Sequence, residues 1–135
     1  MNIIKGIIDE IETDGNFSLV KIDTSIKKFY ALLFESPDKS KHLLRGNKVN
    51  LLFKETEVEI VKDCSSTCNS FLNNFEATFV NANIGKVLTS LNFIIDSITI
   101  NAIIPRKSFE LLNLKINDKA TLIIRTNEIA LEFGE

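Results

Sequence analysis

The 135-residue chain repeats itself once, and this repeat constrains its fold more than any other feature. When the sequence is laid against itself at an offset of 71 residues, Asn2 falls on Asn73 and no gap is needed. Few paired residues are identical, but apolar residues fall on apolar residues along the whole length. We interpret the chain as a duplication, with unit one at 1–61 and unit two at 73–135. Pairs that carry this interpretation are Ile4 with Phe75, Val20 with Leu91, Phe29 with Ile100, Leu51 with Leu122, Phe53 with Ile124 and Val58 with Ile129.

The stretch at 62–72 separates the two units and has the composition of a linker. Its first part is rich in Ser and Asn and lacks apolar periodicity. It holds the only two cysteines, Cys64 and Cys68, and the only histidine, His42, lies far away in sequence. Two thiols alone cannot complete a tetrahedral zinc site, so we expect reduced thiols in a flexible connector. A redox or metal role within an oligomer is the alternative. His42 lies in a polar stretch that indicates an exposed helical turn rather than a catalytic cleft.

Alternating apolar residues predict that each unit is mostly β. Ile4 and Ile8 share one face of the first run, and Phe75 and Phe79 do the same in unit two. The third run of each unit is almost continuously apolar, which is expected of a strand covered on both faces. The strands expected after the first are 17–23, 29–34, 49–54 and 58–61 in unit one, and 87–94, 98–104, 120–125 and 129–133 in unit two.

One stretch per unit breaks the β pattern and predicts a short helix. Pro105 stands near the start of the stretch at 105–114, and Phe109 and Leu112 lie three residues apart. Its counterpart at 36–43 is a weaker version. We therefore expect a mainly β fold of two tandem OB-like five-stranded Greek-key barrels, each with one short helix. Barrels this small bury little core alone, so we expect the two barrels to pack together or the chain to form an oligomer.

Composition and charge exclude several classes of function. The 16 Lys and Arg against 18 Asp and Glu give a net charge of -2, which disfavours non-specific nucleic-acid binding. One Tyr and no Trp also argue against a single-strand nucleic-acid binder. No apolar run approaches the roughly 18 residues that a membrane helix needs. No signal-peptide pattern is present either, so we expect a cytoplasmic protein without membrane insertion. The length leaves no room for a catalytic domain beside the two units, so we expect no enzyme activity.

The ordered motifs of both units resemble the TOBE domain, which is also called the molbindin or Mop domain. Each unit starts with Asn-x-Φ-x-Gly/Ala, where Φ is apolar, at 2–6 and 73–77. Near its end each unit has Lys/Arg-x-x-Glu-Val/Ile, at 54–58 and 125–129. Unit two also has Ser-x-x-x-Leu-x-Leu-x-x-x-Asp-Lys at 108–119. The resemblance covers almost the whole chain, twice, as in the tandem di-Mop arrangement.

The resemblance implies a cytoplasmic protein that binds molybdate or tungstate, for storage, homeostasis or sensing. It implies no enzyme activity and no organic cofactor. It also implies assembly, because tandem proteins of this kind are similar to trimers, with oxyanion sites between neighbouring units. No helix-turn-helix segment stands before the first motif, and the chain has no Gly-rich phosphate-binding loop. The DNA-binding regulators and transporter ATPases that carry such domains are therefore poorer matches.

The resemblance also indicates which residues hold the oxyanion. The family takes donors from a Ser-Ala-Arg-Asn start, from Thr-x-x-Ser after the third strand, and from a Lys followed by a small residue. In unit two the start is 70–73, which keeps Ser70 and Asn73 but has Leu72 where Arg is expected. The second source, 105–108, keeps only its Ser. The candidate oxyanion ligands of unit two are Ser70, Asn73, Ser108, Arg125 and Thr126, and no metal site is expected.

Unit one keeps fewer donors. Asn2 and Lys54 remain as candidates, but Glu55 would repel an anion. Each candidate also has a structural explanation. In that explanation the Asn side chains cap a strand end or a turn, Ser108 satisfies the start of its helix, and the basic residues are solvated surface. If those explanations hold, the chain is an assembly or regulatory module with decayed sites that partners a molybdate transporter or cofactor pathway.

Overall fold

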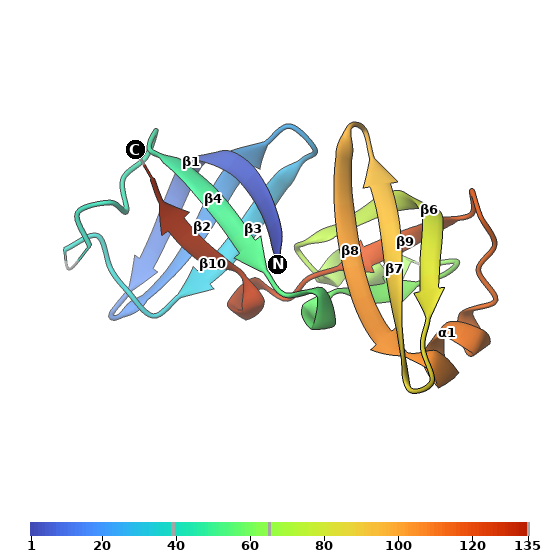
Figure 1. Ribbon diagram of the computed structural model, residues 1–135. Coiled ribbons are helices and arrows are strands. Elements are labelled where there is room, and N and C mark those ends of the chain that lie inside the picture. The colour runs from blue at the N-terminus through green and yellow to red at the C-terminus, as the bar shows by residue number, and fades with distance from the viewer. Residues whose placement is uncertain (39, 65, 135) are drawn as a thin grey trace.

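Ten strands in two five-stranded sheets make up the computed structural model of the chain, which describes residues 1–38, 40–64 and 66–134 (Figure 1). The two sheets lie side by side, and neighbouring strands are antiparallel. The first sheet has the order β10-β4-β1-β2-β3, with β1 (Asn2–Asp14), β2 (Phe17–Thr24), β3 (Lys28–Leu33), β4 (Lys48–Phe53) and β10 (Ala130–Phe133). The second has the order β5-β9-β6-β7-β8, with β5 (Glu59–Val61), β6 (Asn74–Ile84), β7 (Leu88–Ile95), β8 (Ile98–Pro105) and β9 (Lys119–Ile123).

The last strand of each unit is exchanged between the two sheets. Strand β5 of unit one pairs with β9, and β10 of unit two pairs with β4. The five strands that belong to one unit in sequence therefore do not all lie in one sheet. The exchange follows from the chain path, because a 3-10 turn after the fourth strand directs the chain toward the other sheet. These turns are η1 (Glu55–Glu57) and η3 (Thr126–Glu128). The description of the chain as two tandem OB-like Greek-key barrels stays a prediction.

The structure repeats at the offset that the sequence shows. A bulge interrupts the pairing of β1 with β2 between Ile8 and Glu10, and the same irregularity lies between Phe79 and Asn81 in β6. A β-bulge is a local feature with its own backbone geometry, so its recurrence at the same repeat position supports the duplication.

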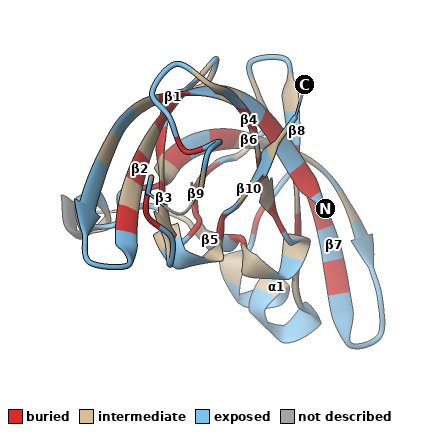
Figure 2. Ribbon diagram, turned by 90° about the vertical axis from the view of Figure 1, so that its left-hand side faces the viewer, coloured by how far each residue is buried: buried red, intermediate tan, exposed pale blue. Residues whose placement is uncertain are grey.

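The apolar positions that pair across the repeat form one buried core. Figure 2 shows buried residues alternating with exposed ones along β7, which is the pattern of a strand with one covered face. The core is continuous between the units, since the Phe29 ring in β3 lies edge-on to the Phe75 ring in β6, with centroids 5.4 Å apart. The predicted repeat pairs are buried on both sides, namely Ile4 and Phe75, Val20 and Leu91, Phe29 and Ile100, Leu51 and Leu122, Phe53 and Ile124, and Val58 and Ile129.

The helix predicted at 105–114 is confirmed. Helix α1 (Arg106–Leu112) follows Pro105 and ends at Asn113, which adopts the left-handed conformation with φ of 51°. Phe109 packs against the core, and its ring centroid lies 6.1 Å from that of Phe79. In the described part of the chain, no helix is both long and apolar enough to cross a membrane.

The helix predicted at 36–43 is wrong. The described residues of this stretch, 36–38 and 40–43, form turns and irregular chain, and residue 39 lies outside the described residues. Short helices need an apolar face packed against the rest of the protein, because isolated helical turns are unstable in water. Leu43 is buried, but no second apolar side chain stands three or four residues before it.

The expectation of two reduced thiols in a flexible connector is also wrong. Cys64 and Cys68 form a disulfide, and the linker contains a 3-10 helix, η2 (Ser66–Ser70). The turn brings the two Cα atoms to 6.1 Å, a separation that a disulfide can span. His42 is exposed as predicted, but it lies in a turn and its ring stacks on that of Phe133 at 5.4 Å.

Candidate functional site

Three of the seven predicted site residues line one pocket. Its volume is about 290 Å³, and it lies where the linker meets the end of β9 and the start of η3. Ser70 comes from the linker, and Arg125 and Thr126 come from the turn. The two segments are joined by a backbone hydrogen bond of 3.1 Å from the N–H of Ile124 to the carbonyl of Asn73. The remaining lining residues are Phe71, Leu72, Ile124 and Asn127.

The pocket offers one guanidinium and two hydroxyl groups. Arg125 is exposed, and its Nη2 lies 3.6 Å from Oε1 of Glu59. Exposed ion pairs of this kind contribute little to stability, so Arg125 can exchange Glu59 for another anion at low cost. A guanidinium with neighbouring hydroxyls is a donor set that suits a tetrahedral anion. Glu59 was not singled out in the sequence, because it lies in the other unit and only the strand exchange brings it here.

Asn2 and Asn73 lie outside this pocket, and each is buried. The Asn73 Oδ1 accepts a 2.7 Å hydrogen bond from the N–H of Tyr30, and its Nδ2 donates a 2.8 Å bond to the Tyr30 carbonyl. Asn2 makes the same two bonds, both 2.8 Å, to the backbone of Asn101. Tyr30 and Asn101 are themselves equivalent in the repeat. Each amide therefore extends a strand of the other unit, and only its second Nδ2 hydrogen is left for a ligand.

Ser108 and Lys54 are not brought to the pocket either. Ser108, in α1, lines a separate cavity of about 510 Å³ together with Glu59, Ile60 and Leu112. Lys54 is exposed just before η1, where its backbone N–H donates a 3.1 Å hydrogen bond to Oε1 of Glu57. The structure thus separates the predicted set into one group of three and four residues elsewhere.

The equivalent position in unit one is occupied by an ion pair. Glu55 is the counterpart of Thr126, and its Oε2 lies 2.6 Å from the N-terminal ammonium of Met1. The hydrogen bond from this ammonium lowers the pKa of Glu55 below its usual range. A carboxylate that stays charged in this place would repel an anion. Unit two is therefore the better candidate for a site.

Two glutamates of the 3-10 turns meet close to Arg125. Partial burial is the main cause that raises the pKa of Glu128, and the hydrogen bond to Glu57 and its negative charge act in the same direction. Arg125 acts in the opposite direction. Glu57 and Glu128 are repeat equivalents, so this pair lies where the two units face each other. Negative charge on this pair, together with that of Glu59, opposes an anion near Arg125.

Comparison with solved structures shows the fold of the chain. It is similar to the cytoplasmic molybdate-binding protein ModG, in a crystal form with molybdate bound, with a TM-score of 0.89 and 20% identity over 98% of this chain and 96% of that chain. A second solved chain, the tetrameric p202 HIN2, has a TM-score of 0.30 and 12% identity over 97% and 92% of the two chains, and this likeness carries no argument. No family model and no curated protein matches the chain. The prediction of a mainly β fold is confirmed.

Proposed function

We propose that the chain binds a tetrahedral oxyanion, molybdate or tungstate, and performs no chemistry on it. The observation that carries this proposal is the pocket that gathers Ser70, Arg125 and Thr126 on a fold like that of a molybdate-binding protein. These three residues are among the seven that the sequence motifs of the molbindin type point to. Charge-assisted hydrogen bonds from Arg125, with hydroxyl donors beside it, supply the recognition.

We also propose that the chain works as a cytoplasmic homo-oligomer, a trimer, that stores or senses the oxyanion. The pocket has one cation, and Glu59 already neutralises part of its charge. A dianion needs more positive charge and more donors than this, so a neighbouring copy has to complete the site. Exposed apolar residues on the strands and the linker, among them Ile3, Phe71 and Leu72, offer surface for such a contact.

One observation favours the alternative, an assembly or regulatory module without a working site. Leu72 lines the pocket where the molbindin motif has an arginine. The missing guanidinium removes a strong donor, and the Glu57–Glu128 pair nearby adds negative charge. In this reading the chain partners a molybdate transporter or cofactor pathway and the pocket stays empty.

Isothermal titration calorimetry of the full chain with molybdate and tungstate, with sulfate as the control anion, tests the proposal. We expect saturable binding that sulfate does not reproduce. The substitution Arg125→Gln should weaken it about ten- to hundredfold, because a hydrogen bond to a charged group contributes about 1.5–3 kcal/mol.

Lys119→Gln is the matched control, since it also removes one positive charge from an exposed side chain of unit two. Lys119 stands six residues before Arg125, which is about 20 Å along an extended strand. The substitution Lys119→Gln should leave the affinity for molybdate unchanged. Absence of saturable binding at millimolar molybdate would contradict the proposal and favour the assembly module.

A further inference from the structure

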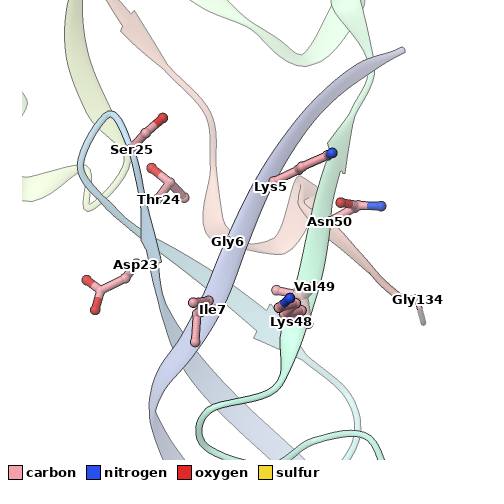
Figure 3. A pocket seen from close by; sticks show the side chains of 10 residues that line it. All are labelled: Lys5, Gly6, Ile7, Asp23, Thr24, Ser25, Lys48, Val49, Asn50 and Gly134. Atoms are coloured by element: carbon pink, nitrogen blue, oxygen red, sulfur yellow. The ribbon is translucent and has the colours of Figure 1, made fainter.

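A third cavity, of about 730 Å³, lies on the first sheet and takes no part in the proposed oxyanion site. Figure 3 shows Lys5, Lys48 and Asn50 on the side of β1 and β4, and Thr24 and Ser25 on the side of β2. The volume falls in the range of about 300–1,000 Å³ that is typical of small-molecule sites. None of the molbindin motif positions that supply oxyanion donors lies among these residues.

Comparison of the two units shows that the charges at this cavity are unusual. The pairing of β1 with β4 matches that of β6 with β9 position for position. In unit two, Nζ of Lys119 and Oε1 of Glu76 form an ion pair of 3.7 Å across this register. Lys48 and Lys5 occupy the equivalent positions in unit one. At these diagonal positions on neighbouring strands, unit one therefore has two positive charges where unit two has a positive and a negative charge. Like charges at such positions repel each other.

No carboxylate in the described part of the chain forms an ion pair with Lys5 or Lys48. Asp23, which also lines the cavity, is 2.9 Å from Nζ of Lys28 and is thus already paired. Glu132, on the neighbouring strand β10, accepts a 3.0 Å hydrogen bond from the amide of Asn50, which itself lines the cavity. Among the described residues, Lys5 and Lys48 therefore bring two positive charges without an ion-pair partner to the cavity, and the carboxylates of Asp23 and Glu132 lie beside it.

The other residues that line the cavity favour an organic ligand over a bare ion. Ile7 is about half exposed and forms an apolar surface beside the two lysines. The Thr24 hydroxyl donates to the carbonyl of Lys27 at 2.6 Å and holds the turn after β2, which presents Ser25 at the rim. A tetrahedral anion of four oxygens is small beside a volume of about 730 Å³. It would leave most of the cavity to the rest of a larger molecule.

We propose that this cavity binds a small organic phosphate, a phosphomonoester, as a second ligand distinct from the oxyanion. The phosphate lies between Lys5 and Lys48, which relieves their mutual repulsion, and the organic part lies against Ile7. Lysine ammonium groups bind phosphate as point charges and need no fixed geometry, which suits two flexible side chains on a sheet surface.

Titration calorimetry of the full chain with adenosine monophosphate and glycerol 3-phosphate tests this proposal, with inorganic phosphate as the comparison. We expect saturable binding of at least one phosphomonoester, tighter than that of inorganic phosphate, and weaker as salt is raised because exposed charges are screened. Lys5→Glu rebuilds the ion pair of unit two. It should weaken binding at least about tenfold while raising the melting temperature of the ligand-free protein.

Two further variants separate this site from the oxyanion site and from general effects of charge. Arg125→Gln should lower molybdate affinity and leave phosphomonoester binding unchanged. Glu76→Gln breaks the ion pair of unit two and should also leave phosphomonoester binding unchanged. The proposal is overturned if no phosphomonoester binds at millimolar concentration, if Lys5→Glu leaves the affinity as it was, or if Arg125→Gln abolishes the binding. Equal affinity for inorganic phosphate would overturn the organic part of the proposal.

Discussion

At the scale of single residues, Gly6 shows how the two units have diverged under the same fold. A Cβ atom built on Gly6 would lie 2.5 Å from Cγ2 of Ile22 and 2.8 Å from the backbone oxygen of Asp23. The second contact is with backbone, so an added methyl group has to move strand β2. The equivalent residue in unit two is Ala77, whose side chain is accommodated in the buried core.

Gly6→Ala should therefore lower the free energy of unfolding by about 1–3 kcal/mol, the usual cost of overpacking a core. Urea denaturation followed by circular dichroism measures the change. Ala77→Gly is the control for the same repeat position, and it should cost only about 1 kcal/mol from added backbone entropy and lost packing. A Gly6→Ala variant as stable as the parent chain would show that β2 adjusts freely.

The buried residues were largely predictable from sequence, whereas the roles of Asn2 and Asn73 were not. Apolar residues repeat with the strand period, so their burial follows from local pattern. The two asparagines hydrogen-bond to backbone that lies 99 and 43 residues away, and no local pattern carries that information. Of the predicted ligands only Ser70, Arg125 and Thr126 line one pocket, because they lie where the linker meets the turn after β9.

At the scale of elements, strands were easier to predict than the sheets to which they belong. Strand β5 and its counterpart β10 have the expected positions, and their alternation suits either sheet equally. The path of the turns η1 and η3 decides which sheet each strand joins, and the sequence alone does not determine that path. The helix expected at 36–43 failed for a related reason. Proline and a polar run suggest a helix start, but only packing of the kind that Phe109 gives α1 stabilises one.

The 3-10 turns η1 and η3 bring Glu57 and Glu128 together, and this predicts a pH-dependent stability. Partial burial and Glu57 raise the pKa of Glu128 in the folded state. A carboxyl group with a raised pKa stabilises the fold when protonated. This contribution is complete below the ordinary Glu pKa of about 4.3 and is lost as the pH rises through the raised value.

Glu128→Gln should thus stabilise the protein at neutral pH, by up to about 1 kcal/mol because the site is only partly buried. The difference from the parent chain should shrink as the pH falls toward 4. Thermal melts of both proteins across this pH range measure it. Glu132→Gln, which alters an exposed carboxylate on β10, is the control for loss of one negative charge. A stabilisation by Glu128→Gln that stays constant with pH would contradict its attribution to the raised pKa of Glu128.

At the scale of the whole molecule, the exchanged strands tie the two sequence units into one folding unit. The first sheet needs β10 on the open edge of β4, and the second needs β5 on the edge of β9. The side chains of Asn2 and Asn73 add hydrogen bonds in both directions between the units. The hydrophobic core is shared as well, through the contact of Phe29 with Phe75. A half-chain therefore lacks an edge strand and exposes part of its core, which neither half can offset alone.

Separate peptides of residues 1–64 and 66–135, kept reduced so that Cys64 and Cys68 do not cross-link them, should for this reason not fold as monomers. Each should lack a cooperative thermal transition, or should pair with a second copy of itself by the same strand exchange. When the two are mixed in equal amounts, we expect them to form a 1:1 complex whose circular dichroism spectrum matches that of the intact chain. Size-exclusion chromatography with light scattering distinguishes the monomer, the homodimer and the complex. A half-chain that unfolds cooperatively as a monomer, with the stability of the intact protein, would show that each sheet forms without its exchanged strand.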